Sequence, residues 1–308
     1  MKYGFVAMYD QETAQFAAKA GFDGMEIFVG PIIDVAMGLD ILNMSDDEIK
    51  RVVDYVGGLG IGFTTLSCNP IHLHGDPAKR AEAGKHFRKA LESAKLMGTD
   101  IVVTNAFTDR TKSPVENLVD FKEVFGEYTK IAESEGVKIA IENCPHWHGT
   151  PPVHGNLAYS PEMWEAMFDA VPSKALGLEF DPSHLVWQGI DYLRAMREFG
   201  DRIYAYHAKD TEMLPEGQYR FGVFGQQLNT VHDWPGGWWR YRIPGYGQVD
   251  WQAIQYLLYE MEYNGPMVIE HEDHVFGGDR SENGLGLGPR TELGLKLGLA
   301  HLKSVKLI

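Results

Sequence analysis

The sequence predicts a (β/α)8 barrel. Eight short apolar segments alternate with eight helical segments along a chain of 308 residues, and barrels of this kind typically need about 250 residues plus insertions. This alternation within one chain favours a closed barrel over an open doubly wound sheet. The first strand is not followed by a glycine-rich phosphate motif, which weakens the nucleotide-binding alternative. We therefore expect one domain over residues 1–308, with an insertion at about 214–247.

The candidate strands are short and apolar, as expected for strands covered on both faces. They are Tyr3–Met8, Gly24–Val29, Gly62–Ser67, Asp100–Ala106, Val137–Glu142, Leu176–Asp181, Ile203–Ala208 and Met267–Glu270. The segments between them carry apolar residues at helical spacing. They are Gln11–Ala20, Asp46–Gly58, Pro77–Met97, Pro114–Glu135, Pro161–Ala170, Ile190–Phe199, Trp251–Tyr263 and Arg290–Ser304.

Helix-start signals support this division of the chain. Ser45 with Glu48, and Ser113 with Glu116, have the spacing of capping boxes. Ser160 precedes a proline, which is favoured in the first turn of a helix. One stretch, residues 214–247, is rich in glycine and aromatic residues and has no clear period. Because it follows the seventh strand, we expect it on the catalytic face as a lid or at a subunit interface.

Charge and cysteine content exclude several classes of function. The formal net charge is -15 at pH 7, so nucleic acids and anionic membrane surfaces, which attract basic patches, are not expected partners. The two cysteines, Cys68 and Cys144, lack the spacing of a zinc motif. No signal-peptide pattern and no apolar run of about 18 residues occurs, so we expect a cytoplasmic protein.

Four residues that commonly bind metals stand at the ends of four successive candidate strands. They are Glu142 in KIAIE, Asp181 in LEFD, His207 in IYAYH and Glu270 in MVIE. Strand ends on one rim of a barrel converge, and three converging carboxylates repel one another unless a cation neutralises them. Three oxygen donors and one imidazole favour one divalent cation, with Mn2+ expected first and Mg2+ or Co2+ as alternatives.

The same segments resemble the sugar phosphate isomerase/epimerase superfamily, the xylose-isomerase-like barrels that include ketose 3-epimerases and inosose-processing enzymes. The motifs are IENCPH, FDPSH, HAKD, PGYGQVDW and IEHED, and the similarity runs from the first strand to the last helix. The resemblance implies that Glu142, Asp181, His207 and Glu270 hold the metal. It also implies that Glu142 and Glu270 form the acid/base pair and that His184 contacts the substrate.

The residue types agree with this chemistry. Removing a proton next to a carbonyl needs a base and a cation that stabilises the negative charge of the resulting enediolate. Two carboxylates beside the cation can remove the proton and return it. We therefore expect a metal-dependent isomerase or epimerase acting on a keto sugar.

Other residues are weaker candidates for the site. Asp210 is expected to orient His207 or to bind a sugar hydroxyl. His72, after the third strand, is a candidate for binding sugar hydroxyls. Trp239 and Arg242, in the 214–247 segment, are candidates for binding the ring or polar groups of the substrate. His146, four residues after Glu142, is a candidate for an additional general base.

Two alternatives remain open. The long aromatic segment, together with a histidine near Glu142, also fits the catalytic subunit of a C-glycoside deglycosidase, a lyase that eliminates the aglycone from a 3-keto-glycoside at the same kind of metal site. A non-catalytic sugar-binding subunit is the other alternative, and it gives no reason for a stoichiometric cation. The expected partners are a small sugar or glycoside, and either further copies of the chain or a smaller subunit. The sequence leaves the sugar and the position of its carbonyl open.

Overall fold

Eight parallel strands close into a barrel in the computed structural model of the protein, which describes residues 1–33, 36–148, 153–223, 237–277 and 286–307. The barrel strands are β1 (Lys2–Ala7), β2 (Gly24–Ile32), β4 (Gly62–Asn69), β5 (Ile101–Thr104), β6 (Lys138–Glu142), β9 (Leu176–Phe180), β10 (Ile203–Ala208) and β13 (Pro266–Ile269). Their order is β1-β13-β10-β9-β6-β5-β4-β2. β1 pairs with both β13 and β2, which closes the ring. The predicted barrel is confirmed.

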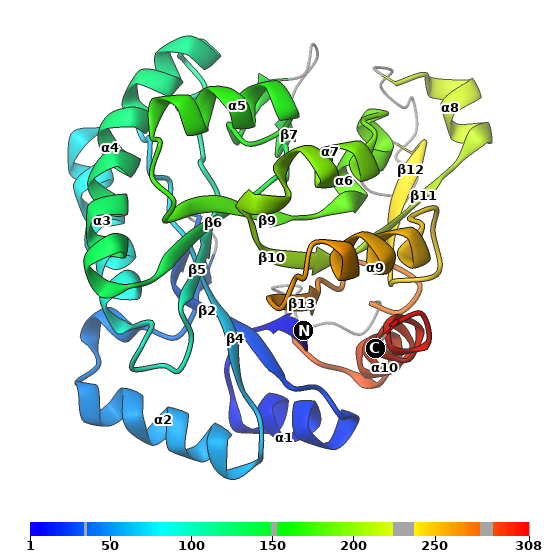
Figure 1. Ribbon diagram of the computed structural model, residues 1–308, viewed down its shortest axis with the longest axis horizontal. Helices are drawn as coiled ribbons and strands as arrows, with labels where there is room; N and C mark the ends of the chain where they lie inside the picture. The colour runs from blue at the N-terminus through cyan, green and yellow to red at the C-terminus, as the bar shows by residue number, and fades with distance from the viewer. Residues whose placement is uncertain (34–35, 149–152, 224–236, 278–285, 308) are drawn as a thin grey trace.

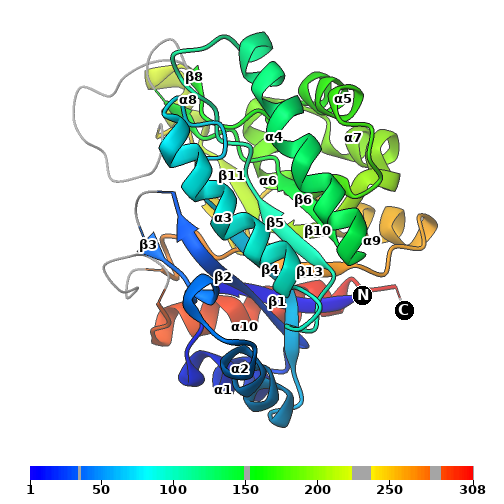
Figure 2. The same ribbon diagram turned by 90° about the vertical axis from the view of Figure 1, so that its left-hand side faces the viewer.

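Helices surround the ring of strands (Figures 1 and 2). They are α1 (Gln11–Ala20), α2 (Asp46–Gly58), α3 (Pro77–Ser93), α4 (Pro114–Glu135), α5 (Pro161–Ala170), α6 (Pro182–Gln188), α7 (Tyr192–Phe199), α8 (Pro215–Phe221), α9 (Trp251–Glu260) and α10 (Pro289–Ser304). Ser45 and Ser113 both form the predicted capping boxes, with Glu48 and Glu116. Ser160 precedes the first turn of α5 but makes no side-chain cap hydrogen bond. No helix in the described ranges is long and apolar enough to cross a bilayer.

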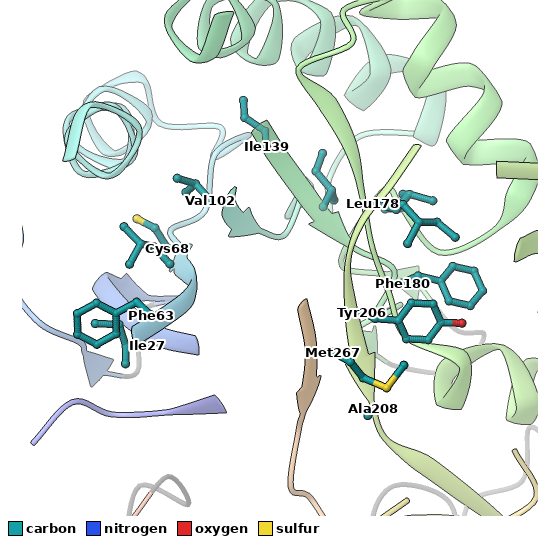
Figure 3. Packing of buried hydrophobic residues seen from close by; sticks show 14 of the residues in the cluster. Ile27, Phe63, Cys68, Val102, Ile139, Leu178, Phe180, Tyr206, Ala208 and Met267 are labelled. Carbon is teal, nitrogen blue, oxygen red and sulfur yellow. The ribbon is translucent and has the colours of Figure 1, made fainter. Parts of the chain in front are cut away.

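Side chains along each strand alternate between the surrounding helices and the interior of the barrel. Leu178, Phe180 and Tyr206 point away from the middle of the barrel, toward the helices (Figure 3). Glu179 lies between Leu178 and Phe180 in the sequence, and His207 directly follows Tyr206. Because successive side chains in a strand point to opposite faces, the side chains of Glu179 and His207 point into the barrel. The apolar layer that supports the barrel therefore determines which polar residues face its interior.

The shorter elements connect the barrel units. They are β3 (Ala36–Met37), β7 (Trp147–His148), β8 (Val153–His154), β11 (Asp210–Met213), β12 (Trp239–Arg242) and the 3-10 turns η1 (Ile41–Asn43) and η2 (Gly200–Arg202). The 214–247 segment, expected to lack regular structure, contains α8 and β12, while residues 224–236 lie outside the described ranges. β12 pairs antiparallel with β11, Met213 opposite Trp239. The local sequence does not indicate this strand because its hydrogen bonds come from a distant partner.

Candidate metal centre

The four residues expected to bind a metal lie on four neighbouring strands. Glu142 ends β6, Asp181 follows β9, His207 lies in β10 and Glu270 follows β13, and these strands are adjacent in the order β13-β10-β9-β6. His207 Nδ1 lies 3.3 Å from Glu142 Oε1 and 3.4 Å from Glu270 Oε2. Neighbouring strand ends therefore bring together two carboxylates and one imidazole.

His184 joins Asp181 to this group. Asp181 is the N-cap of α6, where its Oδ1 accepts a hydrogen bond of 2.8 Å from the Ser183 amide. Because His184 lies in the first turn of the same helix, its ring returns to the strand end. Its Nε2 lies 3.3 Å from Asp181 Oδ2 and 3.4 Å from Glu142 Oε1. The aspartate thus both starts the helix and contacts the histidine.

These positions form a candidate metal-binding group. One ligand atom each from Glu142, Asp181, His184 and Glu270 lies within 4.8 Å of the others. Asp181 Oδ2 is buried and accepts no hydrogen bond from the described residues. His207 Nδ1, in contact with Glu142 and Glu270, adds another donor. Oxygen and imidazole donors, with a buried carboxylate oxygen that accepts no hydrogen bond from the described residues, fit a divalent cation.

Lys209 is a site residue that the sequence analysis missed. Its Nζ is buried and lies 3.2 Å from Asp181 Oδ2 and 2.9 Å from Glu272 Oε2, and it also donates to Glu270. The ammonium lies 4.3 Å from the centre of the Tyr241 ring. Lys209 partly balances the carboxylates at the rim. The sequence did carry a signal for this residue: Lys209 is two residues after His207, so in an extended chain both side chains point to the same face, the interior of the barrel.

The rim carboxylates are held in their charged form. Burial raises the pKa of Glu142, but hydrogen bonds from His184 and His207 outweigh it and hold this pKa well below its ordinary value. Burial also raises the pKa of Glu270, but the positive charge of Lys209 and the contact with His207 outweigh burial and lower this pKa to about 2. Burial lowers the pKa of Lys209, but the neighbouring carboxylates, Asp181 first, raise it well above its ordinary value. Both glutamates are therefore deprotonated carboxylates at neutral pH.

A second group of buried carboxylates lies on the other side of His207. Its Nε2 is 3.2 Å from Glu179 Oε2 and 3.4 Å from Glu26 Oε1. Burial lowers the pKa of His207, but the surrounding negative charges, that of Glu179 first, raise it well above its ordinary value. Burial, and then the charge of Glu26, raises the pKa of Glu179 well above its ordinary value. The sequence analysis missed Glu26 and Glu179, although a lone glutamate inside an apolar strand was a usable signal.

His146 lies near Glu142, as the sequence suggested. A ring nitrogen of His146, a carboxylate oxygen of Glu142 and the sulfur of Cys144 lie within 4.8 Å of one another. His146 has a positive φ of 46°, which is uncommon for residues other than glycine. Its ring packs edge-on against Phe107, with centroids 4.7 Å apart. The turn after β6 therefore brings a third imidazole, after those of His184 and His207, to Glu142.

His72 occupies a different environment. Its buried ring has Nε2 2.7 Å from Thr104 Oγ1 and Nδ1 3.3 Å from the Tyr128 hydroxyl. Phe87 and Phe125 pack against it edge-on or nearly so. Burial lowers the pKa of His72 to about 3. Both nitrogens already have partners inside the protein, so the structure does not present His72 to a sugar.

Asp210 is likewise engaged by the protein backbone. Its Oδ1 accepts hydrogen bonds from the amides of Thr211 and Val249, at 2.8 and 2.9 Å. Its Oδ2 accepts from the Gly245 amide and from Trp251 Nε1, both at 3.0 Å. Asp210 therefore ties the end of β10 to the segment before α9, rather than to His207.

Arg242 and Trp239 are both held within the hairpin of β11 and β12. Arg242 is paired with Glu212 at 2.5 Å and with Asp273 at 2.8 Å. Trp239 is buried and stacks on Trp187, with ring centroids 4.8 Å apart and planes at 5°. Neither side chain contacts the rim group through any of these interactions.

The hairpin reaches the rim through Tyr241. The Tyr241 hydroxyl lies 2.7 Å from His184 Nδ1, and its ring packs against Trp239 with centroids 4.6 Å apart. Tyr241 was one of the aromatic residues of the 214–247 segment expected near the barrel mouth. Among the described residues of that segment, Tyr241 touches a residue of the candidate centre.

Comparison with known proteins agrees with this geometry. The family model of the xylose isomerase-like TIM barrel matches residues 14–305. The chain belongs to this family. The resemblance drawn from the sequence motifs is therefore confirmed.

Curated relatives cover most of the chain. The uncharacterized protein YfiH of Bacillus subtilis (strain 168) is 28% identical over 294 residues, covering 85% of this chain and 88% of YfiH. The inosose isomerase of Bacillus velezensis is 27% identical over 228 residues, covering 74% of this chain and 73% of that enzyme. The chain is thus similar over most of its length to an enzyme named inosose isomerase.

Solved structures share the fold over the whole chain. The 3-keto-D-glucoside 4-epimerase YcjR from E. coli superimposes with a TM-score of 0.69 at 16% identity, covering 99% of both chains. The IolI protein with a bound zinc atom superimposes with a TM-score of 0.65 at 20% identity, covering 99% of this chain and 96% of IolI. At these identities the likeness establishes the shared barrel.

Proposed function

We propose that this protein is a divalent-metal-dependent isomerase or epimerase that removes a proton next to the carbonyl of a keto sugar. The observation that carries the proposal is the convergence of Glu142, Asp181, His207 and Glu270 from four adjacent strand ends. Related proteins named inosose isomerase and 3-keto-D-glucoside 4-epimerase support a keto-sugar substrate. The IolI protein, which binds zinc, supports a metal.

Different residues of the chain would bind the cation, transfer the proton and bind the substrate. Glu142, Asp181, His207 and Glu270 would hold the cation: carboxylate oxygens of Glu142, Asp181 and Glu270 lie within 4.8 Å of one another, and His207 Nδ1 contacts both glutamates. When bound, a cation such as Mn2+ would polarise the carbonyl and stabilise the charge that develops as the neighbouring proton leaves. Glu142 and Glu270, both deprotonated, would remove that proton and return it. The imidazole of His184, held by the Tyr241 hydroxyl, would bind a sugar hydroxyl.

The test is a panel of free ketoses and 3-keto-glycosides, with enzyme stripped of metal and reloaded with Mn2+, Mg2+ or Co2+. We expect epimerisation or isomerisation that depends on the cation. In D2O, deuterium should enter the product or recovered substrate at the carbon that loses its proton. Cation-independent activity, or turnover without any exchange over many turnovers, would contradict the proposal.

A lyase acting on a 3-keto-glycoside is the second candidate, and the position of His146 favours it. A second base beside Glu142 suits elimination of an aglycone after the first deprotonation. With a 3-keto-C-glycoside, the lyase releases free aglycone, whereas the epimerase returns an intact glycoside. Substituting His146→Gln should suppress aglycone release by about 100-fold. Deuterium exchange at the carbon that loses its proton should continue in this variant.

A further inference from the structure

Two carboxylates lie inside the barrel below the rim. Glu26 and Glu179 are 1% and 0% exposed. Glu179 precedes Asp181 by two residues on the same face of the chain, so it lies roughly 6–7 Å deeper. Barrel interiors are ordinarily filled by branched apolar side chains, and a buried carboxylate costs free energy unless it has a partner. The strands β2 and β9 are not neighbours, so the two glutamates approach each other across the interior.

His207 connects this inner pair to the candidate metal centre. Its Nε2 faces Glu179 at 3.2 Å and Glu26 at 3.4 Å, while its Nδ1 faces Glu142 and Glu270 at 3.3 and 3.4 Å. Both oxygens of Glu179 and Nε2 of His207 are buried, and among the described residues their close contacts are with one another and with Glu26 rather than with a conventional hydrogen-bond partner. The imidazole therefore spans two groups of carboxylates with one nitrogen directed at each.

We propose that Glu26 and Glu179 are positioning residues that hold His207 through Nε2 and so direct Nδ1 at the cation of the proposed function, on which this inference rests. An imidazole that binds a cation through one nitrogen keeps an N–H on the other nitrogen. With Nε2–H directed at Glu26 and Glu179, the lone pair that binds the cation is on Nδ1, which faces Glu142 and Glu270 at the rim. Carboxylates placed behind a metal-binding histidine fix its tautomer and increase its basicity.

A second cation among Glu26, Glu179 and His207 is the competing interpretation, since their ligand atoms also lie within 4.8 Å of one another. It would require both nitrogens of one imidazole to bind cations, and the ring would lose both N–H protons. Thr65 Oγ1 also donates to Glu26 Oε2 at 2.5 Å, so that oxygen already has a partner. The single-cation arrangement is the simpler chemistry.

The test is a titration of metal-free protein with Co2+, followed by its visible absorption, on wild type and three variants. Glu179→Leu removes the acceptor, Glu179→Gln keeps an amide oxygen that accepts from Nε2–H, and Gln255→Leu is a control at a buried polar residue of α9. We expect Glu179→Leu to weaken Co2+ binding by about 10–100-fold and to change the spectrum. Glu179→Gln should lose less, and Gln255→Leu should match the wild type.

Thermal unfolding of the metal-free variants separates positioning from folding. Removing a buried carboxylate from an acidic cluster should leave the Tm unchanged or raise it, so affinity and stability should move in different directions. If Glu179→Leu does not fold, the Co2+ affinity of Glu179→Gln still tests the positioning role of Glu179.

Each outcome points to a different conclusion. If the wild type binds one Co2+ and the folded Glu179 variants bind it equally well, the positioning role is overturned while the proposed function stands. Two Co2+ per wild-type chain, with the second lost in Glu179→Leu, would establish an inner cation site instead. A wild type that binds no Co2+ overturns the proposed function, and this inference with it.

Discussion

Glu142 and Glu270 lie on either side of the same nitrogen of His207, and both are held as carboxylates. Replacing either by glutamine keeps its size but removes its ability to accept a proton. We expect Glu142→Gln and Glu270→Gln to lower kcat by at least about 100-fold, even in excess Mn2+, which compensates for weaker metal binding. Steady-state rates with circular dichroism test this.

The matched control is Glu272→Gln, two residues after Glu270 and likewise in contact with Lys209. It removes one negative charge from the same region, and its rate should stay within a few-fold of the wild type. An equal loss in Glu272→Gln would mean that general electrostatics, not proton transfer, explains the effect. A near-normal rate in either of the first two variants would show that the acid/base pair is misassigned.

His72 makes stability depend on pH. Its folded pKa of about 3 lies below the ordinary value near 6.5, so the unfolded chain binds a proton that the folded protein excludes. Stability should fall as the pH drops below 6.5, and this residue should account for about 2 kcal/mol between pH 7 and pH 5.

Urea unfolding at both pH values measures the effect. The variant His72→Gln keeps a donor for Thr104 and an acceptor for Tyr128, and it should lose that part of the pH dependence. His301→Gln, on the outer helix α10, serves as the control and should keep it. If His72→Gln loses as much free energy of unfolding between pH 7 and pH 5 as the wild type, the folded protein must accept the proton at His72.

At the scale of the elements, Asp210 fixes how the chain leaves β10 and enters α9. One carboxylate accepts four donors, from Thr211, Gly245, Val249 and Trp251. An amide group offers only one acceptor oxygen and turns an NH2 toward the other donors. We expect Asp210→Asn to lower the free energy of unfolding by about 2–4 kcal/mol, measured by urea titration.

Asp250→Asn is the matched control for Asp210→Asn. Asp250 is the N-cap of α9, where it accepts from the Ala253 amide at 2.9 Å. Asparagine caps helices about as well as aspartate, so this change should cost only a few tenths of a kcal/mol. Similar losses in both variants would show that Asp210 is not a special junction.

The regular elements could be predicted because their signals are local. The helices α1, α2, α4 and α5 have the predicted bounds, since capping residues and glycines mark their ends in the sequence itself. The hairpin of β11 and β12 was missed because each strand is stabilised by the other, and residues 214–238 separate them in the sequence. The short helix α6 was missed because its start, Asp181, was interpreted as a strand end only.

The candidate site could be predicted only where residues stand at strand ends. Convergence at one rim follows from the barrel, so Glu142 and Asp181 could be placed together in advance. Lys209 and Glu179 required knowing which face of each strand points inward, which the apolar neighbours settle in three dimensions. Conversely, His72 and Asp210 stand near strand ends but are fully used by internal hydrogen bonds, which the sequence does not reveal.

At the scale of the whole molecule, the barrel gathers negative charge at one place. Six carboxyl groups, on Glu26, Glu142, Glu179, Asp181, Glu270 and Glu272, surround His207 and Lys209. Unlike the surface charges, most of these groups are buried, and their mutual repulsion is screened little by salt. The fold therefore tolerates a charge excess in its centre that a cation would relieve.

Cation binding should accordingly stabilise the entire barrel. A ligand at 100 times its Kd that binds only the folded state adds about 2.7 kcal/mol, which for a barrel of this size raises the Tm by roughly 5 °C. We expect Mn2+ to produce such a shift in metal-free protein, and a chelator to reverse it, in a thermal unfolding scan.

Asp181→Asn should abolish the shift while keeping the N-cap of α6, because asparagine also caps helices. Asp250→Asn, the same exchange at the cap of α9, should retain the full shift. A Tm that ignores Mn2+ in the wild type, or that responds equally in Asp181→Asn, would place any cation elsewhere than at the rim of strands β6, β9, β10 and β13.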